Sequence, residues 1–208
     1  MKRTIIQSIG VLTCLIMGFT SQAQSSLTIE GSQNITNFKF TNSLGEKVEG
    51  YGSSYSGGYA LGYKYSLENG MYFPCKIGMR KAGATYIYDN ANYLWSFNYF
   101  ETRLGIGYNY SFGKFGAHIS AMGYFGYLLK ANQRLNNQDF DIRSTGDINK
   151  TDVGLFISPG ANFTANEYIS VYIDLNYMFG LGNLETDDTQ KSNNRMFGAT
   201  LGLAFTIK

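Results

Sequence analysis

The sequence feature that most constrains the fold is a strict alternation of apolar and polar residues between Ile169 and Leu181. Since successive side chains of a β-strand point to opposite faces, this pattern predicts a strand with one apolar and one polar face. The run is longer than most strands of soluble proteins need, and its length suits a tilted strand that crosses a membrane. The same pattern recurs along the chain, which predicts a sheet of many such strands.

The alternation predicts eight strands, with the least regular pattern in the first. They cover residues 27–40, 55–67, 71–88, 93–110, 115–130, 151–164, 169–181 and 195–207. Short connections at 68–70, 111–114 and 165–167 alternate with longer ones at 41–54, 89–92, 131–150 and 182–194. Outer-membrane barrels have short periplasmic turns and longer outer loops. The predicted fold class is therefore all-β, an eight-stranded antiparallel transmembrane β-barrel.

A soluble barrel with an apolar interior is the alternative, because alternation alone does not say which face points inward. The composition of the polar face favours the membrane barrel. A water-exposed face should carry many Lys and Glu, whereas this face is mainly Gly, Ser, Asn, Ala and Thr, and only 15% of the chain is charged. Small residues suit the narrow interior of an eight-stranded barrel. We expect Gly62, Gly78, Gly105, Gly107 and Gly202 to make room there for larger neighbours.

Aromatic residues near the strand ends are candidates for the two interfacial girdles of a membrane barrel. We expect Tyr65, Phe112, Phe163 and Tyr168 at one rim and Tyr88, Tyr93, Trp95 and Phe179 at the other. Outer-membrane lipid is the partner that such girdles imply.

The N-terminus has the layout of an export signal. Lys2 and Arg3 precede an apolar segment at 5–19, and small residues at Ser21 and Ala23 predict cleavage before Gln24. The chain then divides into a signal peptide, 1–23, and an outer-membrane barrel domain, 24–208. About fifteen apolar residues are too few for a permanent transmembrane anchor.

Lipoprotein processing at Cys14 is the alternative to this cleavage, because residues 11–14 resemble a lipid-attachment motif. Thr13 is a poor residue before such a site, and the apolar segment continues beyond Cys14 to Phe19. Cleavage by the ordinary signal peptidase is therefore favoured.

Removal of the signal leaves a chain without net charge. The whole chain has 17 Lys and Arg against 15 Asp and Glu, and the signal contributes Lys2 and Arg3 but no acid. This composition argues against nucleic-acid binding, which needs a concentrated basic patch. Cys75 is left as a single cysteine, so no disulfide forms within the chain. We expect a monomer stabilised by its sheet.

Three segments resemble a known family. Residues 97–101 followed by 104–108 are similar to the central strand of PorT-like outer-membrane β-barrel proteins of Bacteroidetes. Residues 121–129 resemble the next strand of that family and residues 174–181 the penultimate one. The family often has Pro two residues after the glutamate that matches Glu101, where this chain has Arg103. The resemblance implies an outer-membrane barrel and, for its namesake, a role in protein secretion.

Seven charged residues are the candidate site of the barrel interior. They fall on the polar face of the predicted strands and are Lys64, Lys76, Arg80, Glu101, Arg103, Lys130 and Asp174. Charges in a narrow interior are costly unless they are paired. We therefore favour a structural network that plugs the barrel over a path for protons or ions, and bilayer conductance separates the two.

No catalytic, cofactor or metal site is predicted. His118 is the only histidine, and it lies close to a short turn, opposite the rim where enzymatic barrels hold their His and Ser. Two acidic groups in the outer loops, Glu185 with Asp187 and Asp188 and Asp139 with Asp141 and Asp147, could collect calcium. Neither has the ligand spacing of an EF-hand, so solvated loops are the favoured interpretation.

Two functions remain open. The first is a non-enzymatic surface or envelope protein whose outer loops, especially 131–150 and 182–194, contact an unknown extracellular or envelope protein. The second is a small pore or a component of a secretion apparatus, for which the PorT resemblance is the specific indication.

Overall fold

The computed structural model describes residues 24–48, 50–89, 91–187 and 189–207, so the predicted signal peptide lies outside the described residues. Nine strands account for most of this part of the chain: β1 (Gln24–Thr41), β2 (Tyr51–Ser66), β3 (Met71–Tyr88), β4 (Ala91–Phe112), β5 (Phe115–Leu135), β6 (Gln138–Asp141), β7 (Thr151–Thr164), β8 (Ile169–Gly180) and β9 (Lys191–Ile207). Within these residues, no helix has the length and apolar character that crossing a membrane requires.

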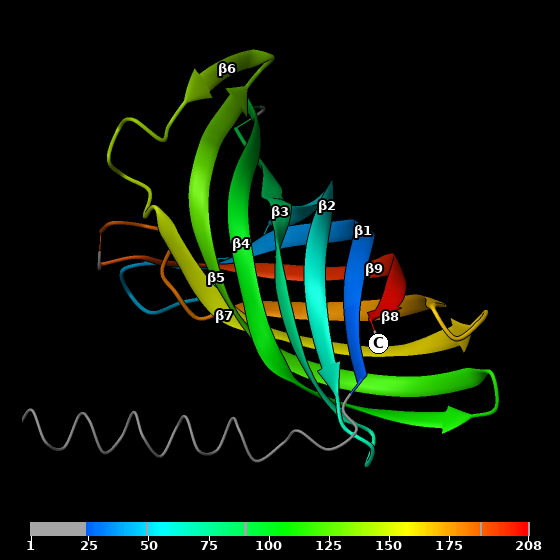
Figure 1. The fold of residues 1–208 in the computed structure, drawn as a ribbon. Helices are drawn as coiled ribbons and strands as arrows, with labels where there is room; N and C mark the ends of the chain where they lie inside the picture. The colour runs from blue at the N-terminus through cyan, green and yellow to red at the C-terminus, as the bar shows by residue number, and fades with distance from the viewer. Residues whose placement is uncertain (1–23, 49, 90, 188, 208) are drawn as a thin grey trace, which may run out of the picture.

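Eight of the strands form a closed antiparallel ring (Figure 1). Strands β1 to β5 pair in chain order, β5 pairs with β7, and β9 closes the ring on β1 along most of its length. The remaining strand, β6, forms a hairpin with the end of β5. The predicted eight-stranded antiparallel barrel is confirmed.

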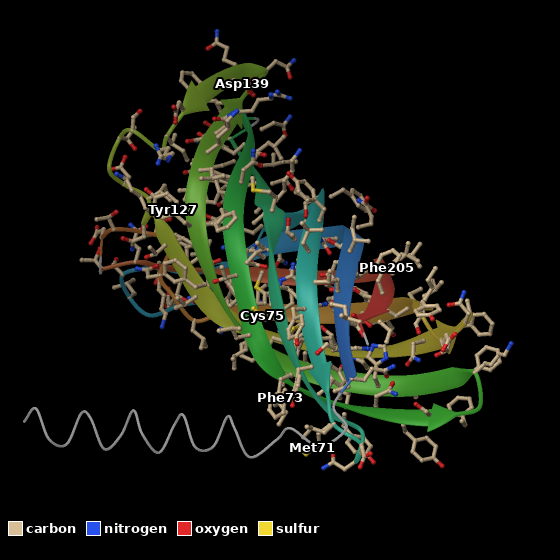
Figure 2. All side chains as sticks on the ribbon, viewed as in Figure 1. Met71, Phe73, Cys75, Tyr127, Asp139 and Phe205 are labelled. Carbon is tan, nitrogen blue, oxygen red and sulfur yellow. The ribbon has the colours of Figure 1, made fainter. Side chains whose placement is uncertain are left out.

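The apolar face of each strand points outward. On β2, for example, Leu61 is 58% exposed and its neighbour Ala60 only 2%. Figure 2 shows Phe73 and Cys75 on β3, where both side chains lie on the exposed face. This orientation contradicts the alternative of a soluble barrel with an apolar interior, because the apolar rows would then face water.

The two ends of the barrel differ. Turns at 67–70, 113–114 and 165–168 lie at one end, the short-turn end, together with both ends of the described chain. The opposite end, the loop end, carries the longer connections, and β5 and β6 project beyond it (Figure 1). The predicted alternation of short and long connections holds except between β3, which ends at Tyr88, and β4, which begins at Ala91, because this connection at the loop end is also short.

Several strands extend further towards the loop end than predicted. Strand β5 continues to Leu135 instead of residue 130, and β9 begins at Lys191 instead of residue 195. Strand β6 lies inside the predicted loop 131–150. The hydropathy pattern marks only the part of a strand that contacts an apolar medium, whereas backbone pairing continues beyond it. The β5–β6 turn has positive φ angles at Asn136 and Asn137, which is typical of a type I′ hairpin.

Candidate functional site

A chain of ion pairs crosses the middle of the barrel interior. Four of the predicted charges belong to it, Lys76, Arg80, Glu101 and Arg103, and all four are buried. Glu30 from β1 and Asp152 from β7 complete it. Its members alternate in sign in the order Lys76, Glu30, Arg103, Glu101, Arg80, Asp152. We call these six residues the ion-pair network.

Glu101 is the centre of the network. Its Oε2 accepts from Arg80 Nε at 2.5 Å and its Oε1 from Arg103 Nε at 2.7 Å. Arg103 Nη1 continues to Glu30 Oε1 at 3.2 Å, and Lys76 Nζ donates to Glu30 Oε2 at 2.6 Å. At the other end of the network Arg80 Nη2 lies 3.0 Å from Asp152 Oδ2. Each carboxylate thus contacts at least one cation, the arrangement that buried charges require.

Neutral donors add hydrogen bonds to two acids of the network, Glu30 and Asp152. Tyr172 OH donates to Glu30 at 2.8 Å. Asp152 Oδ2 accepts from Tyr124 OH at 3.0 Å and from Asn194 Nδ2 at 2.7 Å. The network is therefore tied to β1, β3, β4, β5, β7, β8 and β9, which is nearly the whole ring.

Glu30 and Asp152 are interior charges that were not predicted from the sequence. Glu30 lies in the strand with the least regular alternation, yet it separates the outward Ile29 from Gly31. Asp152 precedes Val153, the first outward apolar residue of β7. In both cases the position relative to an apolar neighbour was a usable signal for an inward carboxylate.

Lys130 does not join the network, contrary to the prediction. A bulge in β5 pairs Asn98 with Lys130 and Tyr99 with Leu128, which leaves Leu129 as an extra residue. Beyond the bulge the alternation shifts by one position, so Lys130 is exposed on the outer face. The strict alternation used for the prediction does not allow for this shift.

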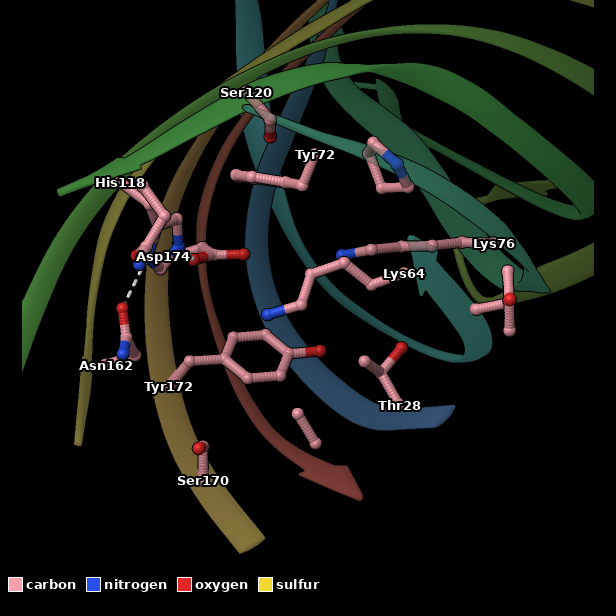
Figure 3. Close-up of a pocket in the computed structure, with 14 residues that line it drawn as sticks. Thr28, Lys64, Tyr72, Lys76, His118, Ser120, Asn162, Ser170, Tyr172 and Asp174 are labelled. Atoms are coloured by element: carbon pink, nitrogen blue, oxygen red, sulfur yellow. Dashed lines mark hydrogen bonds and ion pairs between the residues drawn. The ribbon is translucent and has the colours of Figure 1, made fainter. Parts of the chain in front are cut away.

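The remaining two predicted residues, Lys64 and Asp174, lie nearer the short-turn end (Figure 3). Asp174 Oδ1 is 2.6 Å from His118 Nε2, and His118 Nδ1 is 3.4 Å from Asn162 Oδ1. Lys64 Nζ lies 5.7 Å from the centre of the Tyr72 ring, a cation–π contact. Both residues face the interior, as the prediction requires, but neither belongs to the ion-pair network.

An apolar cluster fills the interior above the network, towards the loop end. Its buried members are Phe38, Ala82, Ala84, Phe97, Tyr99, Leu128, Ala131 and Leu184. Trp95 packs against this cluster and so contributes to the interior, whereas the prediction placed it in the outer aromatic girdle. Trp95 is an even number of residues from Glu101, which puts both on the inward face.

Two loops cover the apolar cluster. We call residues 142–150 and 181–187 the loop cap. Leu184 enters the cluster from it, and Ile142 and Ile148 pack alongside. The two loops are hydrogen-bonded to each other. The backbone N–H of Asn149 donates to Leu184 O at 2.8 Å, and Thr186 Oγ1 donates to Gly146 O at 2.8 Å. The barrel is therefore capped at the loop end.

Glu185 in the loop cap gives a prediction of pH dependence. Partial burial raises its carboxyl pKa above the usual 4.5, and Asp147 and Asp187 raise it further by repulsion. A carboxyl group with a raised pKa in the folded state favours folding more when it is protonated. We expect the loop cap to become more stable as the pH falls from neutral through this raised pKa.

Hydrogen exchange at the backbone N–H of Asn149 measures the stability of the loop cap, because this N–H is bonded to Leu184 O across the two loops. The protection of this N–H should increase on acidification in the wild type, whereas Glu185→Gln should already show high protection at neutral pH and little further change. The loop cap should gain less than about 1 kcal/mol of stability on acidification, because Glu185 is partly exposed. Glu68→Gln, an exposed change at the opposite end, is the control. A wild-type amide that loses protection on acidification would contradict the prediction.

The outer-loop acids do not gather into a metal site among the residues that the structure describes. In this part of the chain, no group of three His, Cys, Asp or Glu side chains is suitably placed to hold a metal ion. Asp188, one of the calcium candidates, lies outside the described residues. The absence of a metal therefore stays a prediction.

Comparisons with known proteins give a family and a set of similar folds. The model of the family described as "Outer membrane protein beta-barrel domain" matches residues 21–185. No curated protein matches the chain. Among solved structures, the outer membrane protein OprG from Pseudomonas aeruginosa has a TM-score of 0.52 at 12% identity, covering 89% of this chain and 97% of that one. At this identity the likeness shows the fold alone.

Two further solved structures are similar at lower TM-scores. The N-terminal β-barrel domain of OprF from Pseudomonas aeruginosa gives 0.49 at 13% identity, covering 89% of this chain and all 100% of that one. Neisserial surface protein A gives 0.47 at 14% identity, covering 86% of this chain and 97% of that one.

Proposed function

Because the chain belongs to the family of outer membrane protein β-barrel domains, we propose that it acts at the cell surface as a binding protein without enzymatic activity. The protein is located in the outer membrane. Short turns of such barrels face the periplasm and long loops face outside, so the loop end is extracellular. In this proposal the protein is a monomer in outer-membrane lipid, and it contacts an extracellular or envelope protein through its loops.

The filled interior supports binding over transport. The ion-pair network and the apolar cluster occupy successive levels of the lumen, and a second buried cluster of Met122, Tyr124, Phe156, Met178 and Met196 lies beside the network. Arg103 packs on Phe156 with its Cζ 4.7 Å from the ring centre, which joins the two. An eight-stranded barrel has no spare interior width once such side chains are in place.

The observation that best supports a binding function is the β5–β6 hairpin. It projects beyond the barrel, and every residue from Asn136 to Asp141 is exposed (Figure 1). Phe140 is 47% exposed there, and Arg134 and Asp139 form an ion pair beside it at 2.7 Å. An exposed aromatic residue with neighbouring charges on a projecting hairpin is suited to protein contact.

A pair of matched deletions tests the proposal. Removing Gln133, Arg134, Asp139 and Phe140 shortens the β5–β6 hairpin by two paired rows, takes out the exposed aromatic residue and the ion pair, and leaves the Asn136-Asn137 turn. The control removes Ser111, Phe112, Phe115 and Gly116 at the opposite end of β5, leaving the Gly113-Lys114 turn. Partners are recovered from intact cells by surface cross-linking and identified by mass spectrometry.

We expect the wild type and the short-turn control to recover the same partner and the hairpin deletion to lose it. Retention of the partner by the hairpin deletion would contradict the proposal. Recovery of secretion-machine subunits would favour the alternative that the PorT resemblance implies, which stays a prediction. The purified wild-type protein in planar bilayers should give no steady single-channel currents. Such currents would favour a pore.

A further inference from the structure

The lumen below the ion-pair network opens towards the periplasm. A cavity of about 70 Å³ lies among inward side chains that include Lys64, Tyr72, His118, Asn162 and Asp174 (Figure 3). A wider mouth of about 430 Å³ continues from it to the short turns, and Lys64, Asn109, Asn162 and Ser170 line both. Because the ion-pair network crosses the lumen above the cavity, this space is a funnel closed at its inner end.

Lys64 is the cation that this funnel leaves without an anion. Salt bridges within 4 Å engage Lys76, Arg80 and Arg103, but none joins Lys64 to a carboxylate of the described residues. Its ammonium group is directed into the cavity, towards the space between Tyr72 and Tyr172 (Figure 3). Lys64 is only partly exposed, so its ammonium group gains less from bulk water than that of a surface lysine, and an anionic partner stabilises it.

The acids nearest to Lys64 are already engaged. Asp174 Oδ1 is bonded to His118 at 2.6 Å. Glu30 accepts from Lys76, Arg103 and Tyr172. The salt bridges of these two carboxylates are to His118, Lys76 and Arg103 and not to Lys64, so the position next to the Lys64 ammonium group is open to a solute.

The walls of the cavity suit a carboxylate. Besides the ammonium group of Lys64 they offer the hydroxyls of Thr28, Tyr72 and Ser120 and the amides of Asn109 and Asn162. Among the described residues, the one acid in the walls, Asp174, is bonded to His118. A carboxylate can accept from an ammonium group with one oxygen and from a neutral donor with the other. We propose that the periplasmic funnel binds the carboxylate of a small solute at Lys64, with the rest of the solute in the mouth.

Binding of a carboxylate can be measured through the imidazole signals of His118. This residue is the only histidine in the sequence and it lines the cavity, so the imidazole signals of untagged protein report on this site without further assignment. The probe is sodium acetate, exchanged for sodium chloride at constant ionic strength and pH, with the protein folded in detergent micelles. We expect the imidazole signals of the wild type to shift along a saturating curve.

Two lysine variants distinguish a site from a general salt effect. Lys64→Met should weaken acetate binding roughly tenfold or more, because it removes a charge-assisted hydrogen bond. Lys81→Met, a change on the exposed face of β3, should bind as the wild type does. Folding of each variant is checked by its migration in unheated detergent gels. A linear dependence of the wild-type imidazole shift on acetate concentration would overturn the proposal. A saturating curve in Lys64→Met equal to that of the wild type would overturn it as well. The wild-type curve alone decides where a variant does not fold.

Discussion

Replacing Glu101 with glutamine should lower the free energy of unfolding by about 3–5 kcal/mol, since removing one partner leaves buried charges uncompensated. Glu101 is 1% exposed and is the only contact between the two halves of the ion-pair network. Without its charge, Arg103 keeps Glu30 and Arg80 keeps Asp152, but three cations then face two acids. Glutamine has nearly the same shape, so the change tests charge and not packing.

The matched control removes an acid from an exposed pair with arginine. In Asp139→Asn the partner is Arg134, and Asp139 and Arg134 are 56% and 50% exposed, so water and salt screen the pair and the loss should be far smaller than in Glu101→Gln. Unfolding by urea in lipid vesicles can be followed by the fluorescence of Trp95, the only tryptophan. Equal losses in the two variants would show that the buried network contributes no more than a surface pair.

The sequence was sufficient to predict the architecture, because lipid contact imposes a period of two on each strand. Leu104 and Ile106 point outward and Glu101 and Arg103 inward, as their alternation predicts. Lys76 and Arg80 alternate with outward residues in the same way and are buried in the interior. Alternation within a strand is a local property, and it can be read without knowing which strands are neighbours.

The ion-pair partners and the loop cap could not be predicted, because they depend on contacts between distant parts of the chain. The pairing of Arg103 with Glu30 joins residues 73 positions apart and requires the register of the closed ring. The bulge that turns Lys130 outward has no marked hydropathy signal. The loop cap depends on Leu184 and Ile148, single apolar residues in polar loops, meeting over a cluster that only the folded barrel creates.

Gly202 is one of the positions in the barrel interior where the fold leaves no room for a side chain. The sequence predicts that it makes room for a larger neighbour, and the structure identifies this neighbour as Tyr172. Gly202 pairs with Tyr172 of β8 on one side and with Glu30 of β1 on the other, so the Tyr172 ring lies over it. A Cβ atom at Gly202 would contact Tyr172 Cζ and lie 2.6 Å from its Cε1.

Valine at Gly202 should therefore displace the Tyr172 ring and break its 2.8 Å hydrogen bond to Glu30. Overpacking together with the lost bond should cost about 3 kcal/mol or more. Gly31→Val is the matched control, because nothing lies within 4 Å of its Cβ position on the exposed face of β1. There the better strand former should stabilise by up to about 1 kcal/mol. Urea unfolding in vesicles should thus give opposite signs for the two variants, and a neutral Gly202→Val would show that Tyr172 does not need this space.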